Sequence, residues 1–265
     1  MPKLIHHLLK NYGLSLGFIV TLLTFWEVSI YQFGIPQWKL PAPSAIFIEL
    51  KNNYPLFLSH TKVTALEAIA GFLIALMLGI ALALMISVSQ LIRRAIYPII
   101  ISSQTIPTIV VAPLLLIWIG YGLTPKIVTV VLLTFFPIVV STVDGLRSVD
   151  RDIIRVMLTT GASPYQIFFK VRLPASLPSI FSGMKISATF CVIGAVVGEW
   201  IGSSEGLGYL TRVSVPLFLT ARSFAAVLIL ALMGVGFFLL ISLIEFKMLK
   251  WKKTSEIGFD KSWMS

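Results

Sequence analysis

Charged residues and cysteine are scarce in this chain. Only 12% of its 265 residues are charged, whereas 57% are hydrophobic and the mean hydropathy is +0.94. A soluble domain carries about 25% charged residues, so the composition excludes an ordinary soluble protein and indicates that most of the chain lies in lipid. The single cysteine, Cys191, excludes a disulfide within one chain and a cysteine-based metal site. Because it lies in an apolar run, we expect a small buried hydrophobic residue.

Sequence signatures of metal-dependent and nucleotide-dependent chemistry are also missing. The three histidines, His6, His7 and His60, form no H-E-x-x-H pattern, which argues against a zinc hydrolase. No G-x-x-x-x-G-K-[ST] occurs, so the chain has no P-loop and any ATP that drives it is bound by another subunit. We therefore expect no metal and no cofactor in this chain. A carrier driven by an ion gradient usually has ionisable groups near the middle of the membrane, and none is well centred in the apolar segments.

The net charge of +10 comes mainly from lysines and arginines in short loops beside apolar runs. In a soluble protein such a charge would suggest a nucleic-acid partner. Here it indicates membrane topology, because cytoplasmic loops carry an excess of basic residues. Most of these residues fall on the side that holds both termini and the 144–179 loop. We expect this side to be the cytoplasm, with the lipid bilayer as the surroundings and no nucleic-acid partner.

Six apolar segments are long enough to cross a membrane as helices, for which about 20 residues suffice. They are residues 13–31, 65–88, 95–119, 126–143, 180–201 and 224–245. The first resembles a signal peptide, but no A-x-A-like site follows it and Glu27 lies within it, so we expect an uncleaved span. The sequence thus predicts an all-α integral membrane protein with six transmembrane helices, in which residues 1–265 form a single transmembrane domain. An even number of spans agrees with both termini lying on one side.

Prolines interrupt the third segment at Pro98, Pro107 and Pro113, which predicts a kinked helix. Proline is tolerated in a span where the freed carbonyl groups find partners or line a cavity. Gln104, Pro107 and Pro113 are therefore candidates for the translocation pathway. A kink that serves only packing is an equally good interpretation.

Carboxylates near the apolar segments need an explanation, because a charge at the centre of a spanning helix is unfavourable by about 2.5–3.5 kcal/mol. Glu199, next to Trp200, falls at the outer end of the fifth segment. Both residues are pathway candidates, at an outer gate or in contact with substrate. Alternatively, Glu199 is an interfacial carboxylate, hydrated or paired with Arg212 or Arg222. Glu67, at the outer edge of its span, needs no special explanation.

Small residues recur every four positions in two of the segments. They are Gly71, Ala75, Gly79 and Ala83 in the second segment and Gly194, Gly198 and Gly202 in the fifth. This spacing lets helices approach closely in lipid. We favour static packing over a seam along which helices slide.

The longest polar loop, residues 147–179, carries two short helical patterns. We expect the first to end at Gly161, because a glycine in the left-handed conformation commonly follows the last residue of a helix. The second begins with Ser163 at the N-cap, proline next, and Gln166 three residues after the cap, which is a capping box. We expect Pro174 to end it. A helix of two turns is unstable alone in water, so its aromatic residues need a groove on a partner protein.

The stretch GASPYQIFFKVRLPASLPSIFSG, residues 161–183, resembles the EAA loop in the permease subunits of ATP-binding-cassette (ABC) importers. In that family the loop supplies the coupling helix, which sits in a cleft of the ATPase. The resemblance implies that the ATPase-coupling residues are Gly161, Ala162, Ser163, Tyr165, Phe168, Phe169, Leu173 and Pro174. The acidic-Ala-Ala start of the family motif is here Arg155, Val156 and Met157, so the contact of that acidic residue with the ATPase does not carry over.

The resemblance extends along most of the chain, to the stretches LPAPSAI, TKVTALEAIAGF, SQTIPTIVVAPLLLIWIGYGL and GEWIGSSEGLGYL. They are similar to the importers of nitrate, sulfonates, taurine and thiamine-precursor pyrimidines. GYGLTPKIV and VDGLRSVD, together with Glu67, most resemble thiamine-precursor and riboflavin permeases, so we expect a thiamine-precursor pyrimidine as substrate. The family implies a type I (MetI-like) permease fold in the bacterial cytoplasmic (inner) membrane. It also implies a homodimer, two ABC ATPase subunits that bind the ATP, and an extracytoplasmic solute-binding protein.

A different class of protein, an intramembrane serine hydrolase, is suggested by GSSEG at residues 202–206. The stretch fits G-x-S-x-G with Ser204 as nucleophile and His60 as base, but it follows an apolar helix and not a strand. We therefore do not expect an enzyme. An ion channel or a stand-alone carrier would explain six spans but not the capped cytoplasmic helix. The apolar stretch 202–222 is expected to form either a partly re-entrant gate or an interfacial helix.

Overall fold

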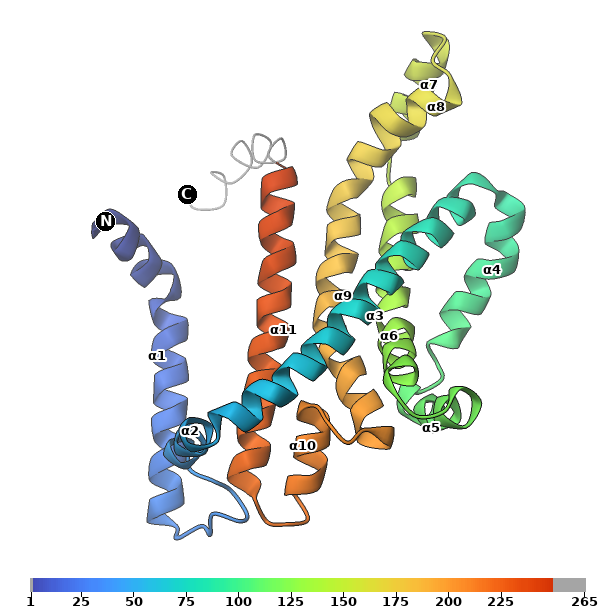
Figure 1. Ribbon diagram of the computed structural model, residues 1–265. Helices are drawn as coiled ribbons and strands as arrows, with labels where there is room; N and C mark the ends of the chain where they lie inside the picture. Colours follow the sequence, from blue (N-terminus) through green and yellow to red (C-terminus); the bar gives the residue numbers. More distant parts are fainter. Residues whose placement is uncertain (1, 250–265) are drawn as a thin grey trace.

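The computed structural model describes residues 2–249, with side chains from residue 13 onward except residues 15 and 16. Every regular element in this part of the chain is helical, and no strand occurs in it. Figure 1 shows long helices side by side and short helices near the two ends of the bundle. The prediction of an all-α protein is confirmed.

Four helices in the described part of the chain are long and apolar enough to cross a membrane. They are α3 (Tyr54–Val88), α6 (Leu123–Arg147), the continuous helix Pro164–Gly202 and α11 (Thr220–Met248). They contain the second, fourth, fifth and sixth predicted segments. Helix α1 (Pro2–Gln32) includes the first predicted segment, although it is not one of the four. The membrane-spanning character of the chain is confirmed, and the total of six spans stays a prediction.

The third predicted segment is not one kinked helix. It forms α4 (Gln90–Ser103) and α5 (Thr108–Ile119), which are bent by 100° across residues 104–107, as in a broken span or a re-entrant loop. Pro107 stands at the N-cap of α5. Its ring disfavours helical backbone in the residue before it, and it has no N–H with which to continue α4. Pro107 therefore divides this segment, whereas Pro98 and Pro113 lie inside α4 and α5.

Helix α6 lies at the centre, with α3 and α9 (Leu173–Gly202) packed against it (Figure 1). Glycines of both partners face α6 at close range. A Cβ added at Gly79 would lie 2.8 Å from Ile138 Cγ2, and one added at Gly194 would lie 2.8 Å from Val130 Cα. Both separations are too short for a side chain, so glycine lets the three helices approach. The small-residue pattern thus lies where α3 and α9 pack closely against α6, and static packing stays the favoured interpretation.

The short helix α2 (Pro43–Asn52) lies at the end of the bundle opposite to the loop between α6 and α9 (Figure 1). It is held to α1 because Glu27 accepts hydrogen bonds from the backbone N–H of Ser44 at 3.0 Å and from its hydroxyl at 2.6 Å. It is held to α11 by the ion pair between Arg222 and Glu49, at 2.8 Å. The carboxylate of Glu27 thus serves as a helix cap.

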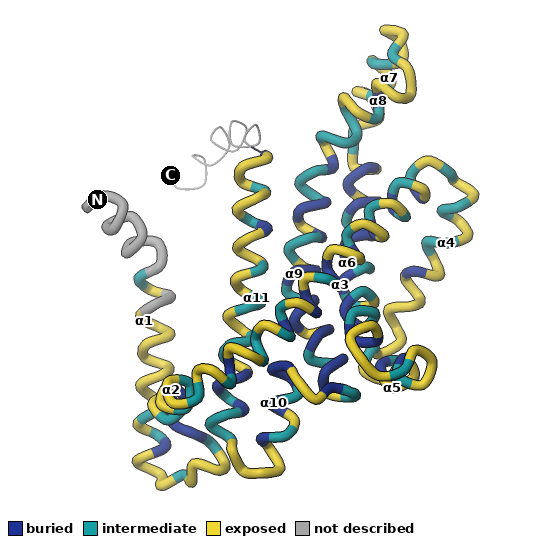
Figure 2. The backbone as a smooth tube through the Cα atoms, viewed as in Figure 1, coloured by how far each residue is buried: buried dark blue, intermediate teal, exposed yellow. Residues whose placement is uncertain are grey.

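Buried residues are concentrated on α6, α9 and part of α3, whereas α1, α11 and α5 are largely exposed (Figure 2). Cys191 is buried in the core, as predicted. Many of the exposed side chains are large and apolar, and on α5 Ile117 is 77% exposed and Trp118 is 70% exposed. Exposed apolar surface of this extent marks a surface that contacts membrane or other subunits.

Candidate functional site

The loop between α6 and α9 forms a lobe that projects beyond the other helices (Figure 1). It begins with α7 (Arg151–Thr159), whose N-terminus is capped by the carboxylate of Asp150. Gly161 follows with a φ of +79°, in the left-handed region that glycine adopts without strain. The predicted stop at Gly161 is therefore confirmed. We call residues 161–174 the coupling segment.

The capping box at the start of the coupling segment is also confirmed. The hydroxyl of Ser163 accepts a hydrogen bond from the backbone N–H of Gln166 at 3.3 Å. The side-chain oxygen of Gln166 in turn accepts one from the backbone N–H of Ser163 at 2.9 Å. These reciprocal bonds satisfy two donors at the start of α8 (Pro164–Ile167) and fix where the helix begins.

The predicted end of this helix at Pro174 is wrong. Helix α8 continues through a π-helical turn, Phe168–Arg172, into α9, so that Pro164–Gly202 is one helix of 39 residues. In the π turn the N–H of Leu173 donates to the carbonyl of Phe168, five residues earlier. This wider turn accommodates the ring of Pro174, which in a regular α-helix would clash with the carbonyl four residues before it. The coupling segment is therefore a direct extension of α9.

The coupling segment presents aromatic side chains on its surface. Tyr165 is 70% exposed, and its ring centroid lies 4.4 Å from that of Phe169. Of the eight predicted coupling residues, Gly161, Ser163, Tyr165 and Phe169 are exposed and Ala162, Phe168, Leu173 and Pro174 are partly buried. On α7, Ile153 and Val156 are more than half exposed. Apolar side chains this exposed on a projecting lobe are suited to a groove on another protein.

The five predicted pathway residues differ in burial. Gln104 and Pro107 are exposed at the break between α4 and α5, and Pro113 is exposed within α5. Trp200 is 45% exposed on α9, whereas its neighbour Glu199 is buried. The assignment of these residues to a pathway stays a prediction.

An ion pair that the sequence did not indicate joins α3 to α6. The Nζ of Lys126 lies 2.7 Å from Oε1 of Glu67 and donates a second hydrogen bond, of 2.7 Å, to the hydroxyl of Ser203. The side chain of Glu67 is fully buried and that of Lys126 is 11% exposed. The expectation that Glu67 needs no special explanation is wrong, because its side chain is buried and forms an ion pair.

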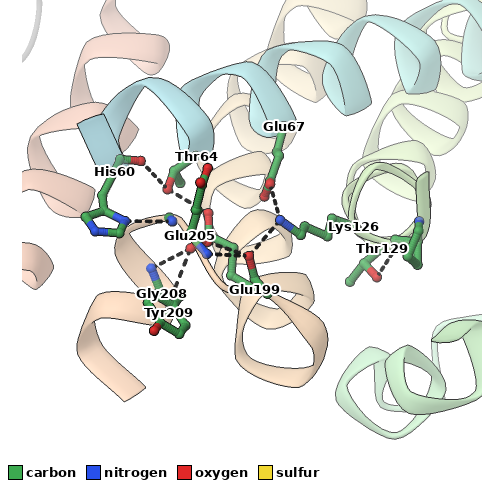
Figure 3. A network of polar contacts seen from close by, with 12 residues as sticks. His60, Thr64, Glu67, Lys126, Thr129, Glu199, Glu205, Gly208 and Tyr209 are labelled. Carbon is green, nitrogen blue, oxygen red and sulfur yellow. Dashed lines mark hydrogen bonds and ion pairs between the residues drawn. The ribbon is translucent and has the colours of Figure 1, made fainter. Parts of the chain in front are cut away.

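Glu199 is fully buried and is held by α3 and by the helix that follows α9. Its carboxylate accepts a hydrogen bond of 2.6 Å from the hydroxyl of Thr64, and others from two backbone N–H groups of α10 (Leu207–Ser214). The predicted pairing with Arg212 or Arg222 is wrong, since Arg212 donates to backbone carbonyls and Arg222 pairs with α2. Burial also contradicts a hydrated interfacial carboxylate. Figure 3 shows Thr64 and Glu67 on α3 facing Glu199 and Lys126.

Residues 75–250 match the family described as binding-protein-dependent transport system inner membrane component. This chain belongs to that family. The permease is 38% identical to the formylaminopyrimidine transport permease protein of Halalkalibacterium halodurans, over 89% of this chain and 94% of that protein. It is 34% identical to the riboflavin transport system permease protein of Chloroflexus aurantiacus, over 90% and 91%. It is therefore a multi-pass membrane subunit of an ABC importer.

Solved structures confirm the type I (MetI-like) fold of the permease. The MetNI methionine ABC transporter in an inward-facing conformation superposes with a TM-score of 0.56 and 20% identity, over 74% of this chain and 94% of that chain. An amino acid ABC transporter gives a TM-score of 0.61 and 19% identity, over 76% and 98%. At these identities the likeness concerns the fold alone.

The permease is a transport protein and not an enzyme, as its relatives are transport permeases. The last glycine of its G-x-S-x-G pattern, Gly206, is required by the local backbone and packing. The Nδ1 of His60 accepts a hydrogen bond of 2.9 Å from the backbone N–H of Gly206, and within the described residues no hydrogen bond joins it to the exposed Ser204. Gly206 has a φ of +107°, and a Cβ there would overlap the carboxylate of Glu199. Glycine is needed at this position for both reasons.

These contacts make one buried polar network, formed by residues of α3, α6, α9 and the start of α10 (Figure 3). In the permease this network holds the stretch after α9 against α3 and α6. The region described shows no group of three side chains suited to hold a metal ion. The stretch 202–222 contains the packed helix α10, and its role as a gate stays a hypothesis.

Proposed function

We propose that this permease imports a thiamine-precursor pyrimidine across the bacterial cytoplasmic membrane. Riboflavin, nitrate, sulfonates and taurine are alternative substrates of the same mechanism. The order of similarity supports the pyrimidine, since the formylaminopyrimidine permease is 38% identical, the riboflavin permease 34%, and the taurine transport system permease protein of Escherichia coli 27%.

Two copies of the permease form the pathway, and two ABC ATPase subunits dock on the two 147–179 loops. A solute-binding protein delivers the substrate on the opposite face of the membrane. The observation that supports this best is the direct continuity of the coupling segment with α9. The start of α1, the end of α11 and the coupling segment lie at one end of the bundle, which agrees with cytoplasmic termini (Figure 1).

ATP binding draws the two coupling segments together. Because each segment continues α9, the displacement passes along the helix and is not absorbed at a hinge. The populations of the inward-open and outward-open states then follow the different affinities of these states for ATP and for the loaded binding protein. We keep Gln104, Pro107, Pro113, Glu199 and Trp200 as candidate residues of the pathway.

Gly161→Asp and Phe168→Asp test the docking of the ATPase. Both place a charge on the lobe that the ATPase is proposed to grip, and Phe168→Asp also removes a partly buried ring. We expect each variant to insert in the membrane but to lose the ATPase on co-purification. Gly34→Asp is the matched control, because Gly34 also has a positive φ with open space around it, in the turn after α1. Normal recovery of the ATPase with both lobe variants would contradict the proposal.

The substrate is tested by reconstituting the permease, its ATPase and its binding protein in liposomes. We expect ATP-dependent uptake of formylaminopyrimidine, with little uptake of riboflavin or taurine. Preferential uptake of either of the other two would reassign the substrate and leave the mechanism in place. Uptake by the permease alone, without any ATPase, would contradict the mechanism itself.

A further inference from the structure

Four arginine side chains from four elements line one cavity beside the coupling segment. They are Arg93 of α4, Arg147 of α6, Arg151 of α7 and Arg172 of the π turn. The cavity has a volume of about 340 Å³. Polar side chains at the turn between α3 and α4, Ser87 and Gln90, complete part of its wall. The cavity is thus strongly basic and lies between the lobe and the spanning helices.

Within the described residues, none of these four arginines forms an ion pair with a carboxylate. The ion pairs found in the described region involve other residues. The Nε of Arg172 is buried and has no hydrogen-bond partner in the part of the chain that the structure describes. Three carboxylates, those of Asp144, Asp150 and Asp152, lie close in sequence to Arg147 or Arg151, but within the described residues none of them forms an ion pair with the four arginines. Like charges gathered in one cavity repel each other, so an anion that enters it is held by several attractions at once.

A phosphate group is the anion that suits these guanidinium groups best, because their planar N–H donors match its oxygens in pairs. Exposed apolar side chains occur beside the arginines, where the apolar helix α3 ends and α4 begins. Val88, which lines the cavity, is 83% exposed, and Leu91, three residues further along the chain, is 79% exposed. A ligand with a phosphate head and apolar chains suits both the arginines of the cavity and the exposed apolar side chains beside them. Basic pockets between spanning helices on the cytoplasmic side are a known type of site for anionic headgroups.

We propose that this cavity binds a phosphate group, supplied by an anionic phospholipid of the inner leaflet or by free phosphate. The inference rests on the proposed function, which puts the coupling segment in the cytoplasm. Arg151 and Arg172 belong to the lobe, whereas Arg93 and Arg147 belong to the spanning helices, so a phosphate bound between them ties the lobe to the bundle. A second cavity, of about 270 Å³, shares Arg172 and is lined by Phe168 of the coupling segment. Binding of a phosphate group in the arginine-lined cavity therefore affects the coupling segment, which is proposed to dock the ATPase.

The test is lipid binding to the purified permease, with and without its ATPase, measured by native mass spectrometry in detergent. The permease is titrated with phosphatidylglycerol and, separately, with phosphatidylcholine, whose headgroup has no net charge. Arg93→Gln/Arg172→Gln removes two charges from the cavity. The control Arg94→Gln/Lys170→Gln removes two charges from exposed neighbours that do not line it. We expect phosphatidylglycerol to bind wild type and control equally and the cavity variant at least tenfold more weakly, with phosphatidylcholine equally weak for all three.

Added inorganic phosphate distinguishes the two sources. If millimolar phosphate displaces phosphatidylglycerol, the site accepts a phosphate group from either the lipid or free phosphate. If the lipid stays bound, the site is specific for the phospholipid. Equal phosphatidylglycerol binding by the cavity variant and the control overturns the proposal. Loss of phosphatidylglycerol from wild type when the ATPase is added also overturns it, because the ATPase then fills the cavity. A permease that binds the lipid as expected but retains no ATPase contradicts the proposed function and supports this inference.

Discussion

Replacing Lys126 with methionine tests the buried ion pair between α3 and α6. Methionine keeps a long, flexible apolar side chain and removes the charge. The fully buried carboxylate of Glu67 then loses its ion-pair partner, and its Oε2 already has no hydrogen-bond partner among the described residues. Breaking a buried pair in this way destabilises a protein by about 3–5 kcal/mol, because an uncompensated charge stays inside. At about 2–4 °C per kcal/mol for a chain of this size, the unfolding midpoint falls by roughly 6–20 °C.

The assay is thermal unfolding of the purified permease in detergent, followed by tryptophan fluorescence. The control Lys62→Met removes an exposed lysine from α3, the helix that carries Glu67, and should change the stability by no more than about 0.5 kcal/mol. The double variant Glu67→Gln/Lys126→Met removes both charges and should recover most of the loss, because a neutral replacement of a buried pair is often tolerated. A Lys126→Met protein as stable as wild type would refute the reasoning. So would a double variant no more stable than the single one.

Two further predictions concern the stretch after α9 and the orientation of the chain. Gly206→Ala should destabilise by at least about 2 kcal/mol more than Gly120→Ala, because both glycines have positive φ but only the first would displace the carboxylate of Glu199. Unfolding midpoints of the two variants check this, and equal midpoints would contradict it. Cysteine introduced at the exposed Thr160 should react with a membrane-impermeant maleimide only after cells are opened, and cysteine at the exposed Ser204 should react in intact cells. The reverse pattern would overturn the proposed topology.

Local features of the coupling segment follow from the sequence because their causes lie within a few residues. The capping box needs only Ser163 and Gln166, which are three positions apart, and both hydrogen bonds are present. The stop at Gly161 needs only a residue that tolerates a positive φ. The family motif covers the same stretch, so the residues and the resemblance lead to one conclusion.

Features that depend on distant contacts could not be predicted from the sequence. Glu67 and Lys126 are 59 positions apart, and Thr64 and Glu199 are 135 positions apart, so no local pattern links the members of either pair. The end expected at Pro174 is wrong for a different reason. The proline rule assumes regular α-helical hydrogen bonds, and the π turn before Pro174 removes the clash on which that rule depends.

The coupling segment lies at one end of a single long helix, and Glu199 of the buried polar network lies near its other end. Pro164–Gly202 spans 39 residues, or roughly 58 Å at 1.5 Å per residue. Phe168 lies near its first end, in the lobe, and Glu199 lies near its last, where it holds α3 and the start of α10. A displacement of the lobe that passes along this helix would therefore reach the hydrogen bonds of Glu199 with α3 and α10. A fully buried carboxylate is unfavourable unless its hydrogen bonds are made. The helices that Glu199 joins are therefore expected to adopt a few discrete positions in which these bonds form, and not a continuous range of positions. This is the property that a gate worked from a distance requires.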